Sequence, residues 1–250
     1  MTHLMEESSR FIEAAHLAPI EPQLVSLIRG LVDLTYLGPD DDQAIDTLCT
    51  KAEDVAAVCV YPQAIARVKH NLKNTPIKIA TVVNFPQGSS TLDTVLNEIN
   101  TALHYGADEI DAVLPYQDFL AGRFHEVNAF LKAVRTQCPR SILKIIIESG
   151  ALLKPALIRL AGQMVVDNGA DFIKTSTGKI PMGATLEAAY TLLTLIEQNH
   201  QSAVGLKVSG GIRTLPEAHA YLYLARELMG TAWLNPRTFR IGASSLVDDL

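Results

Sequence analysis

Eight short runs rich in apolar and β-branched residues recur along this chain, each separated from the next by a longer stretch with helical periodicity. This alternation is typical of βαβ units and a parallel sheet, because parallel neighbours need a long crossover between them. Several runs are almost wholly apolar, as in Ile142–Ile147, which indicates strands covered on both faces. The predicted strands are Gly30–Leu34, Ala56–Tyr61, Ile77–Val83, Glu109–Leu114, Ile142–Glu148, Asp171–Thr175, Val204–Val208 and Arg240–Ala243.

The intervening helical segments are amphipathic, and no Pro-, Gly- or Ser-rich linker divides the chain. Its length of 250 residues agrees with the roughly 250 of one TIM barrel. We therefore predict an α/β fold, a single (β/α)8 TIM-barrel domain over residues 1–250. Residues 1–24 are predicted to form an extra N-terminal helix that covers the lower end of the barrel. A doubly wound open sheet is the alternative, but eight evenly spaced units favour closure. The clearest helical segments are Thr91–Tyr105, Arg123–Cys138, Lys154–Asn168, Leu186–Asn199 and Pro216–Met229.

The charge balance of the chain indicates which kinds of binding partner are unfavourable. With 21 Lys and Arg against 27 Asp and Glu, the net charge is −6, which argues against nucleic acid or an anionic membrane as the main partner. No apolar run approaches the roughly 18 residues of a membrane span. The N-terminus lacks the basic and apolar regions of a signal peptide, and the three cysteines show no CxxC spacing. We therefore expect a cytoplasmic protein that acts on a small molecule.

Two lysines inside predicted strands are the strongest indication of chemistry. Lys174 lies near the end of the sixth strand, and Lys207 lies in the seventh. Burying an ammonium is costly, so a lysine in a core has a partner or a function. Burial and a neighbouring like charge both lower a lysine pKa, which yields the free amine that carbonyl attack requires. The alternative is that either amine reaches solvent or pairs with a barrel carboxylate.

A short internal repeat supplies a carboxylate for these amines. Gly106–Asp111 aligns with Gly169–Lys174, and both segments lead from a helix into a predicted strand, the fourth and the sixth. Alternate strands of a TIM barrel contribute side chains to the same interior layer. Asp111 and Lys174 are therefore predicted to face one pocket.

Two further charged residues in predicted strands are secondary candidates. Lys144, in the fifth strand, either neighbours Asp111 or projects into the helix layer. Asp33, in the first strand, either positions lysines and substrate hydroxyls or belongs to a buried hydrogen-bonding network. The sequence leaves both alternatives open.

Glycines and hydroxyl-bearing residues follow the last three predicted strands, where TIM barrels often bind phosphate. Backbone N–H groups of such loops can approach an anion closely, and hydroxyls add donors. One such loop is a weak signal because Gly and Ser mark ordinary turns, whereas three in the expected places indicate phosphate. The candidates are Gly178, Lys179, Gly210, Gly211, Arg213, Gly242, Ser244 and Ser245, with the Thr175 hydroxyl as a secondary candidate.

Motifs for metals and common cofactors are missing from the sequence. No His, Asp or Glu cluster has metal-ligand spacing, which argues against a zinc-dependent aldolase. Ile173 stands where a P-loop would have its first glycine, and Ile180 follows Lys179 where it would have Ser or Thr. No Gly-x-Gly occurs, so the dinucleotide fingerprint is absent. We expect neither a metal nor an organic cofactor.

At these residues the chain resembles the bacterial type of deoxyribose-phosphate aldolase, over about Leu31 to Leu246. The most diagnostic stretches are Phe172–Gly178 and Lys207–Arg213. The resemblance implies a class I aldolase that cleaves 2-deoxy-D-ribose 5-phosphate in nucleoside catabolism, with Lys174 as the Schiff-base lysine. It implies that Lys207 lowers the pKa of Lys174, that Asp111 is the acid/base partner through a water, and that the three loops bind the phosphate. It also implies a homo-oligomer, with a dimer favoured.

Two departures from the family pattern stand out. Val208-Ser209 replaces a Pro-Ala pair found in some members, and the last tyrosine is Tyr223, whereas some members end in a tyrosine that assists proton transfer. The first departure is expected to alter loop stiffness and the second to alter turnover. Two other functions remain as alternatives: another Schiff-base barrel enzyme, such as a transaldolase or ketose-phosphate aldolase, and a non-catalytic sugar-phosphate-binding barrel.

Overall fold

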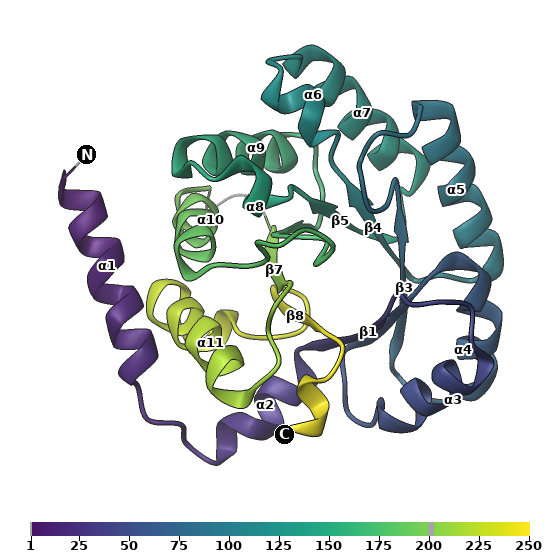
Figure 1. Ribbon diagram of the computed structural model, residues 1–250, viewed down its shortest axis with the longest axis horizontal. Helices are drawn as coiled ribbons and strands as arrows, with labels where there is room; N and C mark the ends of the chain where they lie inside the picture. The colour runs from purple at the N-terminus through teal and green to yellow at the C-terminus, as the bar shows by residue number, and fades with distance from the viewer. Residues whose placement is uncertain (1, 200–202) are drawn as a thin grey trace.

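The computed structural model describes residues 2–199 and 203–250, and its eight strands close into a barrel. Each strand pairs in parallel with the next in chain order, and β8 returns to pair with β1 (Figure 1). The predicted TIM barrel is therefore confirmed, and the open sheet is wrong. The strands are β1 Val32–Tyr36, β2 Ala57–Val60, β3 Lys78–Val83, β4 Glu109–Val113, β5 Ile142–Ile146, β6 Phe172–Lys174, β7 Gly205–Ser209 and β8 Phe239–Ala243.

All eight predicted runs overlap an observed strand, and the largest difference is at β1. The prediction began this strand at Gly30, whereas Gly30 is the last residue of a helix and the strand starts at Val32. Helical hydrogen bonding continues past Gly30, because the backbone N–H of Leu31 donates to the Ile28 carbonyl at 2.9 Å. The apolar character of Gly30-Leu31 therefore reflects a buried helix end rather than a strand.

The helices surround the barrel, and several begin at residues whose side chains cap them. Asp41, Thr91, Thr185 and Thr214 each accept a hydrogen bond from a backbone N–H in the first turn of the helix that follows. The helices are α1 Thr2–Leu17, α2 Gln23–Gly30, α3 Asp42–Lys51, α4 Ile65–Asn71, α5 Leu92–Tyr105, α6 Tyr116–Leu120, α7 Phe124–Gln137, α8 Ser149–Leu152, α9 Pro155–Asp167, α10 Leu186–Gln198 and α11 Leu215–Met229. Short 3-10 turns are η1 Pro62–Ala64, η2 Thr231–Trp233 and η3 Leu246–Asp248.

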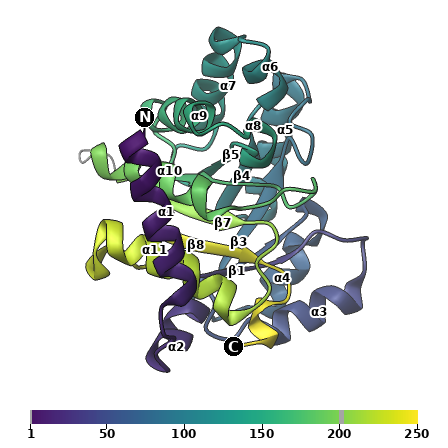
Figure 2. The same ribbon diagram turned by 60° about the vertical axis from the view of Figure 1, so that its left-hand side comes forward.

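The N-terminal segment differs from the prediction in its position. Two helices, not one, precede β1, and α1 runs along the outer side of the barrel against α10 and α11 (Figure 2). Phe11 on α1 lies 5.8 Å from the ring of Tyr190 on α10, measured between centroids. The predicted cover over the lower end of the barrel is therefore wrong for α1, because its apolar side packs onto neighbouring helices.

Buried apolar side chains form one large cluster and two small ones. The larger group lies between strands and helices and contains residues such as Val58, Ile110 and Leu206. A second cluster, Ala57, Cys59, Ala80 and Val82, comes from alternate positions of β2 and β3. These small residues fill one part of the barrel interior and leave the rest to longer side chains from other strands.

Within residues 2–199 and 203–250, no helix has both the length and the apolar character needed to cross a membrane.

Candidate active site

Charged side chains occupy inward positions on six of the eight strands. They follow the two-residue period of a strand, so that Glu109 and Asp111 point inward from β4 while Ile110 between them packs in the outer core. Every one of these charged residues is buried. The set, named here the ion network, consists of Asp33, Glu109, Asp111, Lys144, Lys174, Lys207 and Arg240.

Asp111 lies at the centre of the ion network and holds three lysines. Its Oδ1 accepts a hydrogen bond from Lys144 Nζ at 2.7 Å. Its Oδ2 accepts from both Lys174 Nζ and Lys207 Nζ, each at 2.8 Å. The structure therefore brings Asp111 and Lys174 to one place, as their alignment predicts, and it resolves the position of Lys144 as inward.

Asp33 and Arg240 extend the ion network to the strands where the barrel closes. Lys207 Nζ and Arg240 Nη1 each donate to a different oxygen of Asp33, at 2.5 Å. Arg240 also pairs with Glu109 at 2.9 Å, and Glu109 lies 2.5 Å from Lys144 Nζ. Asp33 thus belongs to a buried network, which was one of its two predicted roles.

Glu109 and Arg240 were not among the predicted site residues. Each is a charged residue inside an apolar strand, in Glu109-Ile110-Asp111 and in Phe239-Arg240-Ile241. The same signal that singled out the strand lysines was therefore present at both positions.

The ion network contains four cations and three carboxylates, and Lys174 is the cation with the fewest carboxylate contacts. Among the described carboxylates, Lys174 forms an ion pair with Asp111 alone, and it shares that Asp111 oxygen with Lys207. Burial lowers the pKa of Lys174 more than the Asp111 carboxylate raises it, and the charge of Lys207 lowers it further. Lys174 is therefore the amine in the network that loses its proton most readily.

The pKa of Lys207 is shifted in the opposite direction to that of Lys174, although both lysines are buried. Burial alone would lower the pKa of Lys207, but the Asp111 and Asp33 carboxylates together raise it above its ordinary value. Burial also opposes charge on Asp111, yet Lys144, Lys174 and Lys207 hold the pKa of that carboxyl well below its usual range. The Asp111 carboxylate at the centre of the network therefore lies between the Lys207 ammonium, whose pKa is raised, and the Lys174 amine, whose pKa is lowered.

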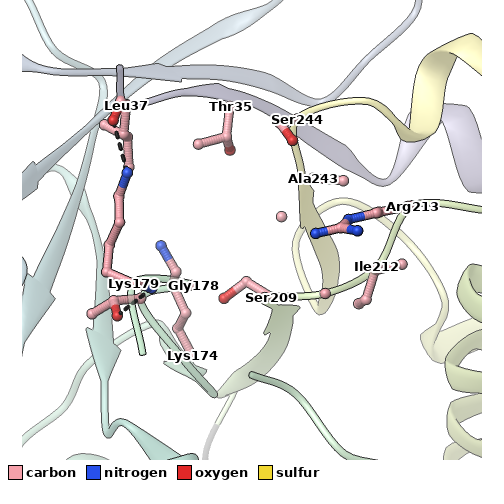
Figure 3. Close-up of a pocket in the computed structure, with 14 residues that line it drawn as sticks. Thr35, Leu37, Lys174, Gly178, Lys179, Ser209, Ile212, Arg213, Ala243 and Ser244 are labelled. Atoms are coloured by element: carbon pink, nitrogen blue, oxygen red, sulfur yellow. Dashed lines mark hydrogen bonds between the residues drawn. The ribbon is translucent and has the colours of Figure 1, made fainter. Parts of the chain in front are cut away.

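A cavity of about 210 Å³ opens beside Lys174 at the carboxyl ends of the strands. Figure 3 shows the amine of Lys174 and the guanidinium of Arg213 pointing into it from different sides. Lys179 borders the cavity too, where its Nζ donates to the Leu37 carbonyl at 2.9 Å. No Asp or Glu is among the described residues that line this cavity, so the charges of Lys179 and Arg213 favour an anionic ligand.

Most of the predicted phosphate residues line this cavity. Gly178, Lys179, Gly210, Gly211, Arg213, Gly242 and Ser244 all do so. Ser245 does not and instead precedes η3, where its carbonyl accepts a hydrogen bond from the Asp248 N–H. Thr175 also lies outside the lining, because its hydroxyl accepts from the Ser209 N–H at 3.0 Å and joins β6 to β7. Lining residues that the sequence analysis did not single out include Thr35, Thr177 and Ser209.

The glycines of these loops are required by close backbone approach. A Cβ on Gly183 would lie 2.2 Å from the Gly210 carbonyl oxygen, a distance that only glycine allows. Gly210 itself has φ +91°, in the region that favours glycine. The loops after β6 and β7 are therefore packed directly against each other at the cavity.

Glu148 binds Thr177, one of the residues that line the cavity. Its buried carboxylate accepts hydrogen bonds from the backbone N–H and hydroxyl of Thr177, the latter at 2.5 Å. Burial raises the pKa of Glu148. Across the part of the chain that the structure describes, no group of three or more His, Cys, Asp or Glu is arranged to hold a metal ion.

The arrangement has the parts that covalent attack on a carbonyl requires. A buried amine with a lowered pKa can act as nucleophile, and an adjacent carboxylate and ammonium can move and hold protons. A model of the DeoC/LacD family of aldolases matches residues 32–245. This chain belongs to the DeoC/LacD family of aldolases.

Solved structures with the same barrel agree with this family membership. A protein from Coccidioides immitis, assigned as a deoxyribose-phosphate aldolase, is 28% identical over 97% of this chain and 96% of its own, with a TM-score of 0.81. The aldolase QR15 is 29% identical over 88% of this chain and 94% of its own, with a TM-score of 0.75. The tetrameric deoxyribose phosphate aldolase of Aeropyrum pernix is 24% identical over 96% and 95%, with a TM-score of 0.76, and shows the shared fold.

Proposed function

We propose that this aldolase cleaves 2-deoxy-D-ribose 5-phosphate reversibly to acetaldehyde and D-glyceraldehyde 3-phosphate, with Lys174 as the Schiff-base nucleophile. Three findings support the substrate: the resemblance of Phe172–Gly178 and Lys207–Arg213 to deoxyribose-phosphate aldolases, the assignment of the Coccidioides immitis relative, and the cation-lined cavity beside Lys174. The reaction would belong to the breakdown of deoxyribonucleosides.

The chemistry follows from the state of Lys174. Its neutral amine attacks C1 of the open-chain sugar phosphate, and loss of water gives an iminium ion. The iminium accepts electrons, so the C2–C3 bond breaks once the C3 hydroxyl is deprotonated, and glyceraldehyde 3-phosphate leaves. Protonation of the resulting enamine at C2 and hydrolysis of the imine release acetaldehyde and regenerate the amine.

Asp111 and Lys207 are assigned to the proton transfers. Asp111 is the base for the C3 hydroxyl, acting through a water that Lys207 polarises, because both groups lie within hydrogen-bonding distance of each other beside Lys174. The Lys207 ammonium keeps its charge through the cycle, since its two carboxylate partners hold it. Lys144 anchors Asp111 from the other side.

The phosphate is assigned to the end of the cavity lined by the loops after β6, β7 and β8. Arg213 and Lys179 supply charge, and the loop glycines admit an anion close to backbone N–H groups. Holding the unreactive end in this way fixes the reacting carbons against Lys174, which converts binding energy into rate.

One observation carries the proposal. Of the three lysines in the ion network, only Lys174 borders the cavity, and it is also the one whose pKa is lowered. Access to substrate and a neutral amine therefore coincide in a single residue.

The test is borohydride reduction in the presence of acetaldehyde, followed by peptide mass mapping. An added ethyl group on Lys174, absent from Lys174→Ala, is the expected result. A label on Lys207 instead would keep the aldolase but reverse the roles of the two lysines. A folded protein with no label on either would favour a non-catalytic sugar-phosphate-binding barrel.

A substrate panel tests the choice of sugar. Cleavage of 2-deoxyribose 5-phosphate, and addition of acetaldehyde to glyceraldehyde 3-phosphate, is expected to exceed activity on ketose phosphates. A preference for ketose phosphates would make the protein a different Schiff-base aldolase on the same barrel.

A further inference from the structure

Arg240 and Glu109 form a charged pair that the proposed chemistry does not use. Neither residue lines the cavity, and both are buried. Arg240 donates to Glu109 through Nη2 at 2.9 Å and to Asp33 through Nη1 at 2.5 Å. A buried ion pair is often no more stabilising than apolar residues of similar volume, so its presence needs another explanation.

The composition of the ion network suggests one. Its three carboxylates can neutralise three of its four cations, which leaves one surplus positive charge in a site shielded from solvent. The surplus proton is most easily lost from Lys174, the cation with a single, shared carboxylate oxygen. Without Arg240 the three lysines and the three carboxylates would be equal in number, and no lysine would need to be neutral.

We propose that Arg240 is a positioning residue for the nucleophile: by taking one oxygen of Asp33 and the carboxylate of Glu109, it supplies the surplus charge that leaves Lys174 as the neutral amine. This inference rests on the proposed function of Lys174. It gives the Arg240–Glu109 pair a role at the reacting amine although the pair does not touch it.

The influence passes along a chain of direct contacts. Arg240 holds Oδ1 of Asp33, and Lys207 holds Oδ2 of the same carboxylate. Without Arg240, Lys207 would interact more strongly with Asp33 and less strongly with Asp111. The Asp111 carboxylate would then stabilise the charge of Lys174 more. Lys174 would then keep its proton.

Other charged or titratable groups around Lys174 do not supply this balance. The Cys59 thiol from β2 and the Glu148 carboxyl have pKa values raised by burial, so both are shifted toward their neutral forms. Burial opposes charge on Lys144, but Asp111 and Glu109 keep its pKa raised. The remaining groups facing Lys174 or its cavity are Asp111, Lys207, Asp33, Lys179 and Arg213.

The competing explanation is that Arg240 only packs. Its guanidinium lies 5.7 Å from the ring centroid of Phe172, and its Nε donates to the Pro236 carbonyl. A packing role would reduce stability on substitution but would leave the pH dependence of Lys174 unchanged. The pH profile therefore separates the two roles.

The experiment compares Arg240→Met, Glu109→Gln and the double variant by the pH dependence of borohydride trapping of acetaldehyde on Lys174. Arg240→Met is expected to shift the midpoint to higher pH by about one unit, which lowers the trapping rate about tenfold below that midpoint. Glu109→Gln removes a carboxylate from the network and is expected to shift the trapping midpoint of Lys174 to lower pH. The double variant restores one surplus charge, so its midpoint is expected near that of the wild type.

Arg240→Lys is the matched control, because it keeps the charge and is expected to keep the wild-type midpoint. Inhibition by inorganic phosphate should be the same in all four variants, since neither residue borders the cavity. Midpoints that do not move, or single variants that shift in the same direction, would overturn the proposal. Should Arg240→Met fail to fold, the direction of the shift in Glu109→Gln decides alone.

This result is separable from the proposed function. If Lys174 is not trapped in the wild type, the proposed function fails before any variant is compared. If it is trapped in the wild type and in every variant at one unchanged midpoint, only the role of Arg240 is lost.

Discussion

The three lysines of the barrel interior have the same side chain and nearly the same burial, yet their pKa values are shifted in different directions. Lys207 contacts two carboxylates and Lys144 contacts Asp111 and Glu109, and each keeps a raised pKa. Lys174 shares one carboxylate oxygen and has a lowered pKa. The number of carboxylate contacts, rather than burial, therefore separates the proposed nucleophile from its neighbours.

The same substitution at two of these lysines is predicted to change stability in opposite directions. Lys174→Met removes an amine that burial disfavours, so the free energy of unfolding at pH 7 should rise by roughly 1 kcal/mol. Lys207→Met leaves Asp33 and Asp111 short of a cation and should lower it by about 3–5 kcal/mol. Urea unfolding followed by circular dichroism measures both.

Retro-aldol activity supplies the control for this pair. Lys174→Met is expected to reduce cleavage to the solution background while the protein stays fully folded. Equal losses of stability in both variants would contradict the assignment of different charge states to the two lysines.

At the scale of elements, the start of α11 connects helix capping to the cavity. Thr214 caps α11, and Glu217 completes a capping box. The Glu217 carboxylate accepts from the backbone N–H of Arg213 at 2.7 Å as well as from that of Thr214 at 3.0 Å. The cap thus fixes the backbone of a residue whose guanidinium points into the cavity (Figure 3).

Thr214→Ala is predicted to affect both stability and phosphate binding. Loss of the cap should cost about 1 kcal/mol of unfolding free energy. It should also raise KM for the sugar phosphate severalfold with little change in kcat, because Arg213 is less firmly held. Steady-state kinetics with inorganic phosphate as a competitive inhibitor measures the second effect.

Thr91→Ala is the matched control, since the Thr91 side chain also caps a helix, α5, but neither neighbour of Thr91 in the chain lines the cavity. It should lose a similar amount of stability and leave KM unchanged. A similar rise in KM in both variants would show that the effect comes from general loosening rather than from Arg213.

At the scale of the whole molecule, the ion network joins six strands through the inside of the barrel. Asp33 on β1, Asp111 on β4 and Lys207 on β7 meet there, and Glu109, Lys144, Lys174 and Arg240 add contacts to β5, β6 and β8. The barrel interior is therefore held largely by charge, alongside small apolar clusters that include Cys59 and Ala80 on β2 and β3 and Val113 and Ile146 on β4 and β5.

Stability is predicted to fall steeply in acid. Although burial opposes their ionisation, the cations around Asp33 and Asp111 hold the pKa of each below its ordinary value of 3.8. Below that value the unfolded chain binds protons that the folded protein excludes, so the free energy of unfolding decreases as pH falls. Urea midpoints measured from pH 6 down to pH 2 should show this decrease, beginning near pH 4.

Salt provides the control for the acid transition. Surface ion pairs such as Arg67 with Asp46 are screened at high ionic strength, whereas buried pairs are screened much less. The decrease should therefore persist in about 1 M NaCl, where the Debye length is about 3 Å. Its disappearance in salt would assign the transition to the surface.

Much of the site was predictable because strand periodicity is a local property. Alternation within β4, β6 and β7 puts Asp111, Lys174 and Lys207 on one face of each strand, and the shared barrel layer makes that face the inner one, whereas the sequence left Lys144 in β5 free to face either side. Glu109 and Arg240 carry the same signal and could have been found with it. The position of α1 was not predictable, because an amphipathic helix can pack on any apolar surface.

The sequence by itself determined the barrel and its eight strands, since these depend on the order and periodicity of neighbouring residues, and it indicated that Lys174, Lys207 and Asp111 enter the interior. Only the tertiary structure decided the contacts that lower the pKa of Lys174 and raise those of Lys144 and Lys207. Lys207 and Asp33 are 174 positions apart, and they meet because β8 pairs with β1 and closes the barrel. The pKa of a buried amine depends on such contacts, because its charge is stabilised by the groups within a few ångströms of it and not by its neighbours in the chain.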